Sequence, residues 1–252
     1  MTITKKPGTA KKRSEAVSKK IETIFWAVPL GLSLVIQGCT GKSTETKEAS
    51  VATEVRSEEG SEAPKSAPAL KNADGSFKPF YVYSDATSPD NHYDPSGWMG
   101  DTGDLTMTQE FLTNPHGGTT SIKITYSAKK TQGAGWAGVY WQNPSNNWGS
   151  KAGGYDLTGA KKLTFWARGE KGGERIEEIK VGGITGEYPD SDVAGIGPVL
   201  LTAEWKQYAI DLTGKDLTSI SGGFCWVTSA ASSTSTEGGE PVTFYLDDIV
   251  YE

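Results

Sequence analysis

Residues 242–252 read VTFYLDDIVYE, and residues 162–168 read KLTFWAR. Both runs are rich in β-branched and aromatic residues, which favour the extended backbone of a strand. Both lack glycine and proline, whereas clusters of Gly, Asn, Asp, Pro and Ser separate the runs of this kind along the chain. Short strands between such turns are typical of an all-β antiparallel sandwich or barrel. The predicted strands cover residues 80–83, 105–111, 121–126, 136–141, 162–168, 176–181, 205–212, 223–228 and 242–251.

Three longer stretches around these strands resemble a known family. They read KKLTFWARGEKGG at 161–173, EWKQYAIDLTGKDLTSISGGFCWVTS at 204–229 and VTFYLDDIVYE at 242–252. They resemble the galactose-binding-like jelly rolls that occur as carbohydrate-binding modules, and the resemblance covers most of residues 78–252. It implies an antiparallel β-sandwich (jelly roll) at 76–252 with a carbohydrate ligand. Proteins of this fold also bind other ligands, so the function has to be argued from the site.

The charge of the chain is unevenly distributed. Its 252 residues carry a formal net charge of −6, but residues 1–38 are basic, and the rest hold 18 Lys and Arg against 29 Asp and Glu. Nucleic-acid binding needs clustered Lys and Arg that neutralise phosphates, so this acidic domain argues against a nucleic-acid partner. The whole chain has two histidines, which argues against multi-histidine zinc sites and most histidine-based catalytic triads.

The first 38 residues have the organisation of a signal peptide. A basic start precedes an apolar run at 24–36, which as a helix would rise roughly 20 Å, short of the ~30 Å hydrocarbon core. A signal-peptide core therefore fits better than a permanent span. Ile36-Gln37-Gly38-Cys39 resembles the lipobox, which implies cleavage before Cys39 and its lipidation, although a small residue is usual in place of Gln37. The alternative is an ordinary signal peptide or an uncleaved anchor.

Residues 39–75 have the composition of a tether. They are rich in Ser, Thr, Glu, Ala, Lys and Pro and contain no aromatic residue, so they bury too little apolar surface to offset the entropy lost on ordering. We predict a disordered segment that holds the domain away from the membrane to which the lipid attaches it. The resemblance, with Thr40 in place of an aspartate, implies a cell-envelope location, at the outer membrane or cell surface, with the domain extracytoplasmic.

Alternation of side chains along four strands predicts a sugar-binding face. Successive residues of a strand point to opposite sides, so placing small and aliphatic residues such as Cys225 and Val227 in the core sends aromatic and charged residues outward. Sugars suit such a surface because their CH faces stack on rings while polar groups bond their hydroxyls. The predicted carbohydrate-binding residues are Trp136, Tyr140, Trp166, Arg168, Glu178, Lys180 and Trp226, with a rim site at Trp98, Trp148 and Tyr188 as the alternative.

That interpretation has a competitor, in which some of these tryptophans cover a second hydrophobic layer. Two measurements separate the possibilities, because truncation of a stacking ring lowers sugar affinity whereas truncation of a buried ring lowers stability.

The same resemblance implies a structural calcium ion. In the resembled modules, an acidic residue of the closing strand, another just after the first strand and carbonyls of a Gly/Thr turn hold the ion. Hard oxygen ligands suit calcium, and the ion would join both ends of the domain. Solvated acids at a capped strand end are the alternative. The matching positions are Asp85, Gly117, Thr119, Asp247 and Asp248.

Catalysis has less support than binding. Glycoside cleavage uses two carboxylates about 5 to 10 Å apart across a cleft, and adjacent acids such as Glu177 and Glu178 point to opposite faces of a strand. Cys225 lies in an apolar run and is expected to be a buried free thiol. We therefore predict a non-enzymatic, polysaccharide-binding surface lipoprotein. The alternatives are a β-sandwich glycan hydrolase or lyase and a structural or protein-binding envelope component.

Cys39 is expected to be the first residue of the mature protein and to carry lipid, so that the protein partitions with membranes. Mass spectrometry of protein purified from a bacterium that processes lipoproteins should detect a lipidated peptide that begins at Cys39. An unmodified Cys39, or a chain that retains residues 1–38, would contradict this prediction.

Overall fold

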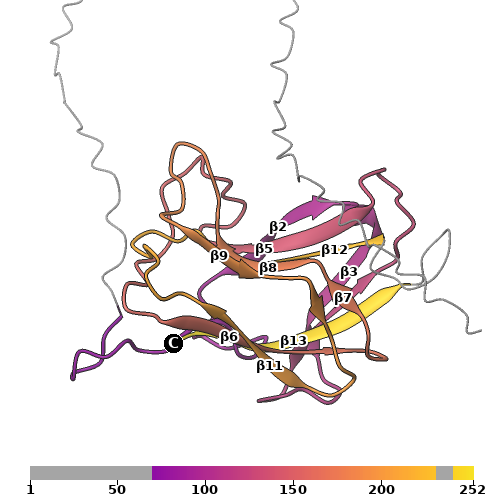
Figure 1. The fold of residues 1–252 in the computed structure, drawn as a ribbon, viewed down its shortest axis with the longest axis horizontal. Coiled ribbons are helices and arrows are strands. Elements are labelled where there is room, and N and C mark those ends of the chain that lie inside the picture. The colour runs from indigo at the N-terminus through magenta and orange to yellow at the C-terminus, as the bar shows by residue number, and fades with distance from the viewer. Residues whose placement is uncertain (1–69, 231–240) are drawn as a thin grey trace, which may run out of the picture. The chain divides into compact units, whose positions relative to one another are not determined.

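Strands β6 (Lys162–Gly169) and β13 (Val242–Tyr251) pair antiparallel in the computed structural model, which describes residues 70–230 and 241–252. They lie side by side in a sheet of order β11-β6-β13-β4-β3, and β1 also pairs with β13 (Figure 1). We call this the six-stranded sheet. Its other strands are β1 (Phe80–Tyr83), β3 (Leu105–Phe111), β4 (Ser121–Tyr126) and β11 (Lys206–Asp211).

A second antiparallel sheet has the order β2-β5-β12-β8-β9, and we call it the five-stranded sheet. A separate short pair is formed by β7 (Arg175–Ile176) and β10 (Val199–Leu200), and a 3-10 helix, η1 (Thr102–Asp104), precedes β3. The strands of the five-stranded sheet are β2 (Asp94–Gly100), β5 (Trp136–Gln142), β12 (Gly222–Ser229), β8 (Glu178–Gly182) and β9 (Val193–Ile196).

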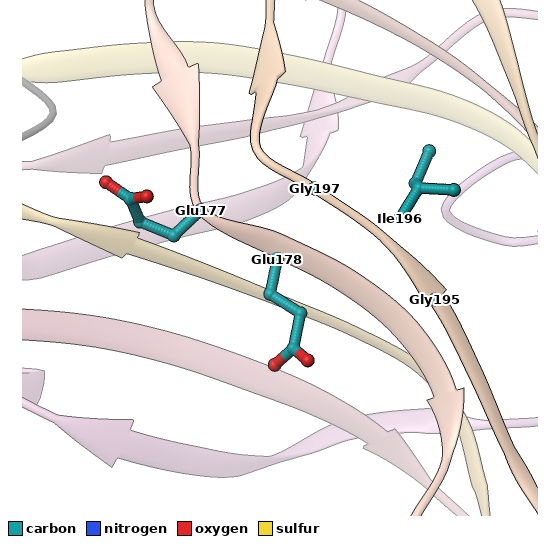
Figure 2. Close-up of a pocket in the computed structure, with 5 residues that line it drawn as sticks. All are labelled: Glu177, Glu178, Gly195, Ile196 and Gly197. Atoms are coloured by element: carbon teal, nitrogen blue, oxygen red, sulfur yellow. The ribbon is translucent and has the colours of Figure 1, made fainter. Parts of the chain in front are cut away.

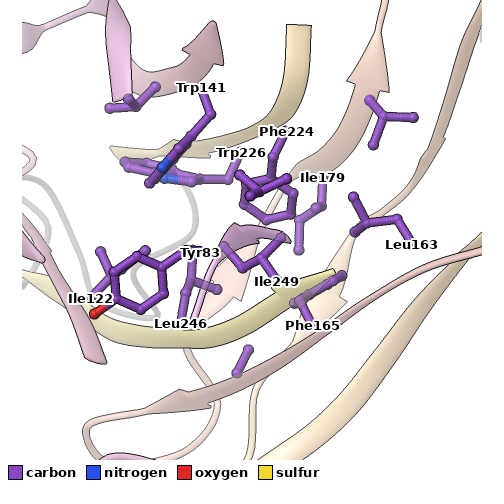
Figure 3. Packing of buried hydrophobic residues seen from close by; sticks show 14 of the residues in the cluster. Tyr83, Ile122, Trp141, Leu163, Phe165, Ile179, Phe224, Trp226, Leu246 and Ile249 are labelled. Carbon is purple, nitrogen blue, oxygen red and sulfur yellow. The ribbon is translucent and has the colours of Figure 1, made fainter. Parts of the chain in front are cut away.

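The two sheets form the layers of a sandwich with the hydrophobic core between them (Figure 1). The Trp226 ring of β12 meets the Phe244 ring of β13 edge to face, with centroids 5.1 Å apart and an interplanar angle of 87°. Such pairs add to the stabilisation that burial of the rings provides. The predicted all-β antiparallel sandwich is therefore confirmed. Buried side chains of both sheets appear in Figure 3, among them Trp141, Phe224, Trp226, Ile122, Phe165 and Leu246.

Most predicted strands occur at the expected residues, and β1, β3 and β4 have the predicted bounds. The predicted strand at 176–181 is divided into β7 and β8, because Glu177 leaves the ladder and donates its backbone N–H to Val227. Strands β2, β9 and β10 are additional to the prediction. Strand β2, DPSGWMG, contains proline and glycine, and β9, VAGI, contains glycine, residues that usually mark turns.

The position of Trp226 corrects the predicted sugar-binding face. Trp226 pairs with Val139 of β5 and Ile179 of β8, and directly paired residues point to the same side of a sheet. Val139 and Ile179 belong to the core, and Trp226 is 0% exposed. Its predicted role in sugar contact is therefore wrong, and its neighbours Cys225 and Val227 point away from the main core instead.

The first described residues already belong to the folded domain. Lys71 forms a β-bridge with Phe77, Lys78 donates its backbone N–H to Leu70, and Leu70 packs against the core. Ordered contacts thus begin before the predicted boundary at residue 76. The predicted signal peptide, Cys39 and most of the predicted tether lie outside the described residues. Within 70–230 and 241–252, no helix has the length and apolarity required to cross a membrane.

Trp226→Ala is expected to lower the free energy of unfolding by about 3 to 5 kcal/mol, because it leaves a cavity beside Phe244. Chemical denaturation monitored by circular dichroism measures this difference. The matched control is Trp136→Ala in the same sheet, which removes a partly exposed ring and should cost about 1 kcal/mol or less. Equal losses for the two variants would contradict the assignment of Trp226 to the core.

Candidate functional site

The outer side of the five-stranded sheet carries two rows of side chains that cross its strands. Strand pairing aligns Met99 of β2 with Gly138 of β5, Gly138 with Val227 of β12, and Val227 with Glu178 of β8. Because paired residues share a face, these four residues form the first row. The second row consists of Gly97, Tyr140, Cys225, Lys180 and Gly195.

Glycines keep parts of both rows free of side chains. A Cβ at Gly138 would lie 2.6 Å from the Trp226 carbonyl oxygen and 3.2 Å from Met99 Cε, so no larger residue fits there without movement. Gly97 and Gly195 are equally tight, with 2.8 Å to Tyr140 Cβ and 2.9 Å to Lys180 Cβ. Gly138 and Gly97 are nevertheless buried by their larger neighbours, and the exposed glycine of the two rows is Gly195, at the β9 end of the second row.

Tyr140 lies beneath this surface and holds other side chains of it in place. Its side chain lies on the predicted outer side, but it is only 5% exposed, and its hydroxyl donates a hydrogen bond to the Gly182 carbonyl. Burial raises the pKa of the Tyr140 hydroxyl far above its usual value. Trp148 packs edge-on against the Tyr140 ring at 5.8 Å, and Lys180 Nζ lies 5.7 Å from the ring centroid. Tyr140 thereby positions an exposed indole and a cation.

Exposed aromatic rings flank the rows. Trp136, at the start of β5, is 37% exposed and packs over Gly100. Trp148 is 44% exposed, and a hydrogen bond from Tyr188 N to the Gly149 carbonyl holds the half-exposed Tyr188 in the neighbouring loop. The predicted sheet-face and rim residues thus meet, because Trp148 contacts Tyr140. Trp98 differs from these rings, because it pairs with the core residue Val139 and so lies on the inner side of the edge strand β2, where it is 39% exposed and its indole N–H donates to the Pro95 carbonyl.

A pocket of about 380 Å³ opens at the β8 side of this surface and is lined by Glu177, Glu178, Gly195, Ile196 and Gly197. The two glutamate side chains leave the chain in different directions (Figure 2). Glu177 accepts hydrogen bonds from Arg175 at 2.9 Å and from the Ser229 hydroxyl at 3.0 Å. Glu178 forms an ion pair with Lys180 at 3.0 Å. Each carboxylate therefore already has a partner, and the two do not face each other.

Two further acids beside this surface, Asp190 and Asp192, hold loops in place. Asp190 accepts hydrogen bonds from the backbone N–H groups of Ile184, Ser221 and Gly222, while burial raises the pKa of its carboxyl group. Asp192 forms an ion pair with Lys215, and a hydrogen bond from the Val193 N–H is the largest of the interactions that lower its pKa.

Cys225 is a free, buried cysteine. Burial raises the pKa of its thiol well above its usual value, so the reactive thiolate is disfavoured. This arrangement fits the expected inert thiol, which packs with Tyr140 and Ile184.

Trp166 and Arg168 do not join the predicted surface. They lie in β6 of the six-stranded sheet, where Trp166 pairs with Asp247 and Arg168 pairs with Tyr245. Leu163, Phe165 and Ala167 alternate with them and point into the core. Trp166 and Arg168 therefore occupy the outer side of the opposite layer. Of the seven residues predicted to contact sugar together, the structure brings together Trp136, Tyr140, Glu178 and Lys180.

The predicted calcium ligands converge on one turn. Asp247 Oδ2 accepts hydrogen bonds from His116 N at 2.8 Å and Gly117 N at 3.2 Å, and Asp248 Oδ2 lies 2.7 Å from His116 Nδ1. Burial, together with the neighbouring Asp248 charge, raises the pKa of Asp247 to about 6. A Cβ at Gly117 would lie 2.6 Å from Asp248 Oδ2, so glycine is required for this approach.

Asp85, which follows β1 near the start of the domain sequence, contacts the same turn. Its Oδ1 accepts hydrogen bonds from the backbone N–H groups of Thr119 at 2.9 Å and Thr120 at 2.7 Å, and a Cβ at Gly118 would overlap its Oδ2. The oxygen donors have the chemistry that calcium prefers. The carboxylates are nevertheless bonded to N–H donors, and in the described part of the chain no three His, Cys, Asp or Glu side chains are grouped closely enough to hold a metal ion.

Comparison with protein-family models and with curated proteins gives no match. Among solved structures, the family 30 carbohydrate-binding module of a Clostridium thermocellum cellulosomal cellulase is 16% identical, over 70% of this chain and 98% of that one, with a TM-score of 0.47. A family 11 module from the same organism, solved with a β-1,3-1,4-mixed-linked tetrasaccharide, is 12% identical over 62% and 86%, with a TM-score of 0.40.

The CBM22-1 xylan-binding domain from Paenibacillus barcinonensis is 11% identical over 64% of this chain and 88% of its own, with a TM-score of 0.36. These neighbours are β-sandwich carbohydrate-binding modules. Identities and TM-scores this low do not establish a function, so the function is inferred from the surface of this chain.

Proposed function

We propose that this chain binds polysaccharide without catalysis, through the outer side of its five-stranded sheet. The observation that carries the proposal is the grouping of exposed Trp136, Trp148 and Tyr188 around rows that include the Glu178–Lys180 ion pair. Aromatic rings stack on the CH faces of sugars, and charged side chains bond their hydroxyl groups. An exposed strip of aromatic and charged side chains suits an extended chain of sugars.

The carboxylates favour binding over cleavage. Glycoside hydrolysis needs one acid that donates a proton and a second, separated carboxylate that faces it across the bond to be cut. Glu177 and Glu178 point in different directions and are occupied by Arg175 and Lys180. Asp190 and Asp192 hold loop backbone in place. A glycan array followed by a reducing-sugar assay on each hit tests this choice, because release of reducing ends would favour a hydrolase.

The proposal includes the cellular location. The lipobox-like sequence that ends at Cys39 and the aromatic-free segment after it support a lipid-anchored protein of the cell envelope, with its domain outside the cytoplasm. A polysaccharide-binding domain on such a tether can reach a ligand beyond the membrane surface. Failure of every glycan on the array to bind would instead favour a structural or protein-binding envelope component.

Trp136→Ala is expected to weaken binding of a neutral polysaccharide hit by about 1 to 3 kcal/mol, a five- to 150-fold loss of affinity, because one stacking surface is removed. Isothermal titration calorimetry measures the affinity. Trp166→Ala serves as the matched control, since Trp166 lies on the opposite layer and its loss should leave the affinity unchanged. A loss only in Trp166→Ala would place the site on the six-stranded sheet.

We further propose that calcium binds at the turn where Asp85, Asp247 and Asp248 meet. Their carboxylates would release hydrogen bonds from N–H donors and coordinate the ion instead. Bound calcium should raise the melting temperature, since an ion that binds only the folded state at a hundredfold excess over Kd adds about 2.7 kcal/mol. Asp248→Ala should abolish the increase, whereas Asp156→Ala, at a distant turn, should retain it. An unchanged melting temperature in millimolar calcium, after thorough chelation, would refute calcium binding.

A further inference from the structure

A row of alternating rings and cations crosses the outer side of the six-stranded sheet. Strand pairing aligns Lys123 of β4 with Tyr245 of β13, and Tyr245 with Arg168 of β6. The Arg168 guanidinium carbon lies 3.7 Å from the Tyr245 ring centroid and 5.3 Å from that of Trp205. Lys123 Nζ lies 5.6 Å from the Tyr245 centroid and 4.9 Å from that of Phe111. We call Phe111, Lys123, Tyr245, Arg168 and Trp205 the cation–aromatic row.

Two further rings extend the cation–aromatic row toward the His116 turn. His116 stacks on Trp166 with centroids 3.7 Å apart and an interplanar angle of 15°, and it meets Trp205 edge-on at 6.1 Å. The Trp205 indole N–H donates to the Asn114 carbonyl at 3.0 Å, which fixes the ring. Trp166 and Trp205 are partly exposed, so ligands have access to fixed aromatic surfaces.

The cations of this row lack carboxylate partners. In the described part of the chain, ion pairs join other side chains, and none includes Arg168 or Lys123. Arg168 Nη1 donates to the Gly169 carbonyl at 3.5 Å, its side chain also interacts with the Tyr245 hydroxyl, and its buried Nε has no acceptor. Glu170 bonds to the Tyr245 hydroxyl instead. In a chain with more acids than bases, two unpaired cations on one face are left available to an external anion.

We propose that the cation–aromatic row is a second binding site, selective for an acidic polysaccharide whose sugars carry carboxylates (a polyuronate). Guanidinium donors match a carboxylate in shape and charge, and the partly exposed indoles of Trp205 and Trp166 offer stacking surfaces to sugar rings. Lys123 and Arg168 come from strands on either side of β13, and Lys123 Nζ and the Arg168 guanidinium carbon lie 5.6 Å and 3.7 Å from the same Tyr245 centroid. A chain with a carboxylate on each sugar can present carboxylates to both cations while its rings stack on the indoles.

The site is independent of the neutral-sugar surface, which lies on the other layer of the sandwich. The test uses the full chain and isothermal titration calorimetry, with polygalacturonate as the probe. We expect binding that weakens as salt concentration rises, and no binding by the same polymer after reduction of its carboxyl groups. Arg168→Gln should lower the affinity roughly ten- to a hundredfold, because charge-assisted bonds are lost. Trp136→Ala should leave polygalacturonate affinity unchanged.

Three results would overturn the proposal: no binding of polygalacturonate by the wild-type chain, unchanged affinity in Arg168→Gln, or equal affinity for poly-L-glutamate, which would mean that the surface detects charge without sugar. Should Arg168→Gln fail to fold, Lys123→Gln and Trp205→Ala replace it, and unchanged affinity in both contradicts the site. Neutral-glycan binding is measured in the same variants. If neutral-glycan binding is lost only in Trp136→Ala and polygalacturonate binding only in the variants of the cation–aromatic row, the two sites are independent. Failure of one proposal can then be distinguished from failure of the other.

Discussion

The register that sets Trp226 opposite Val139 and Ile179 determines the rest of the five-stranded sheet. Because the Trp226 indole packs edge to face with Phe244, β12 presents its large rings to the core, so Cys225 and Val227 must face outward. The same pairing aligns Cys225 with Tyr140 and Lys180, and Val227 with Gly138 and Glu178. A shift of one residue would reverse every one of these positions. The candidate surface is therefore a consequence of core packing.

Local sequence predicts the strands well where one side is clearly apolar. Strand β4, SIKITY, alternates throughout, and its predicted bounds are those observed. In β12, GGFCWVTS, both sides are apolar, since Phe224 and Trp226 alternate with Cys225 and Val227. The alternation of residues along β12 therefore does not indicate which of its two sides faces the core. The space between two sheets favours the larger rings, and that preference becomes visible only when the opposing Phe244 is known.

Alternation also gives the side of a strand but not the sheet to which the strand belongs. Trp136 and Trp166 both point outward as predicted, yet β5 and β6 belong to opposite layers, because long-range pairing assigns β6 to β13 and β5 to β12. Sequence reasoning also missed the contribution of Met99, since β2 contains glycine and proline, and that of Trp205, which lies just before β11. The sequence shows that Trp205 has an aromatic ring with an N–H donor, but its contact with Arg168 depends on the tertiary structure.

The two outer surfaces use similar residues for different chemistry. On the six-stranded sheet, Arg168 covers the Tyr245 ring, so the surface exposes charge above a ring that is 2% exposed. On the five-stranded sheet, Lys180 is paired with Glu178, and the Trp136 ring remains uncovered. The loop that carries Tyr188 is fixed by Asp190, whose carboxylate accepts hydrogen bonds from the backbone N–H groups of Ser221 and Gly222, where β12 begins. A surface held in this way loses little conformational entropy when a ligand binds. Asp190 therefore has a structural role, because its carboxylate holds the backbone N–H groups that fix the loop beside the proposed binding surface.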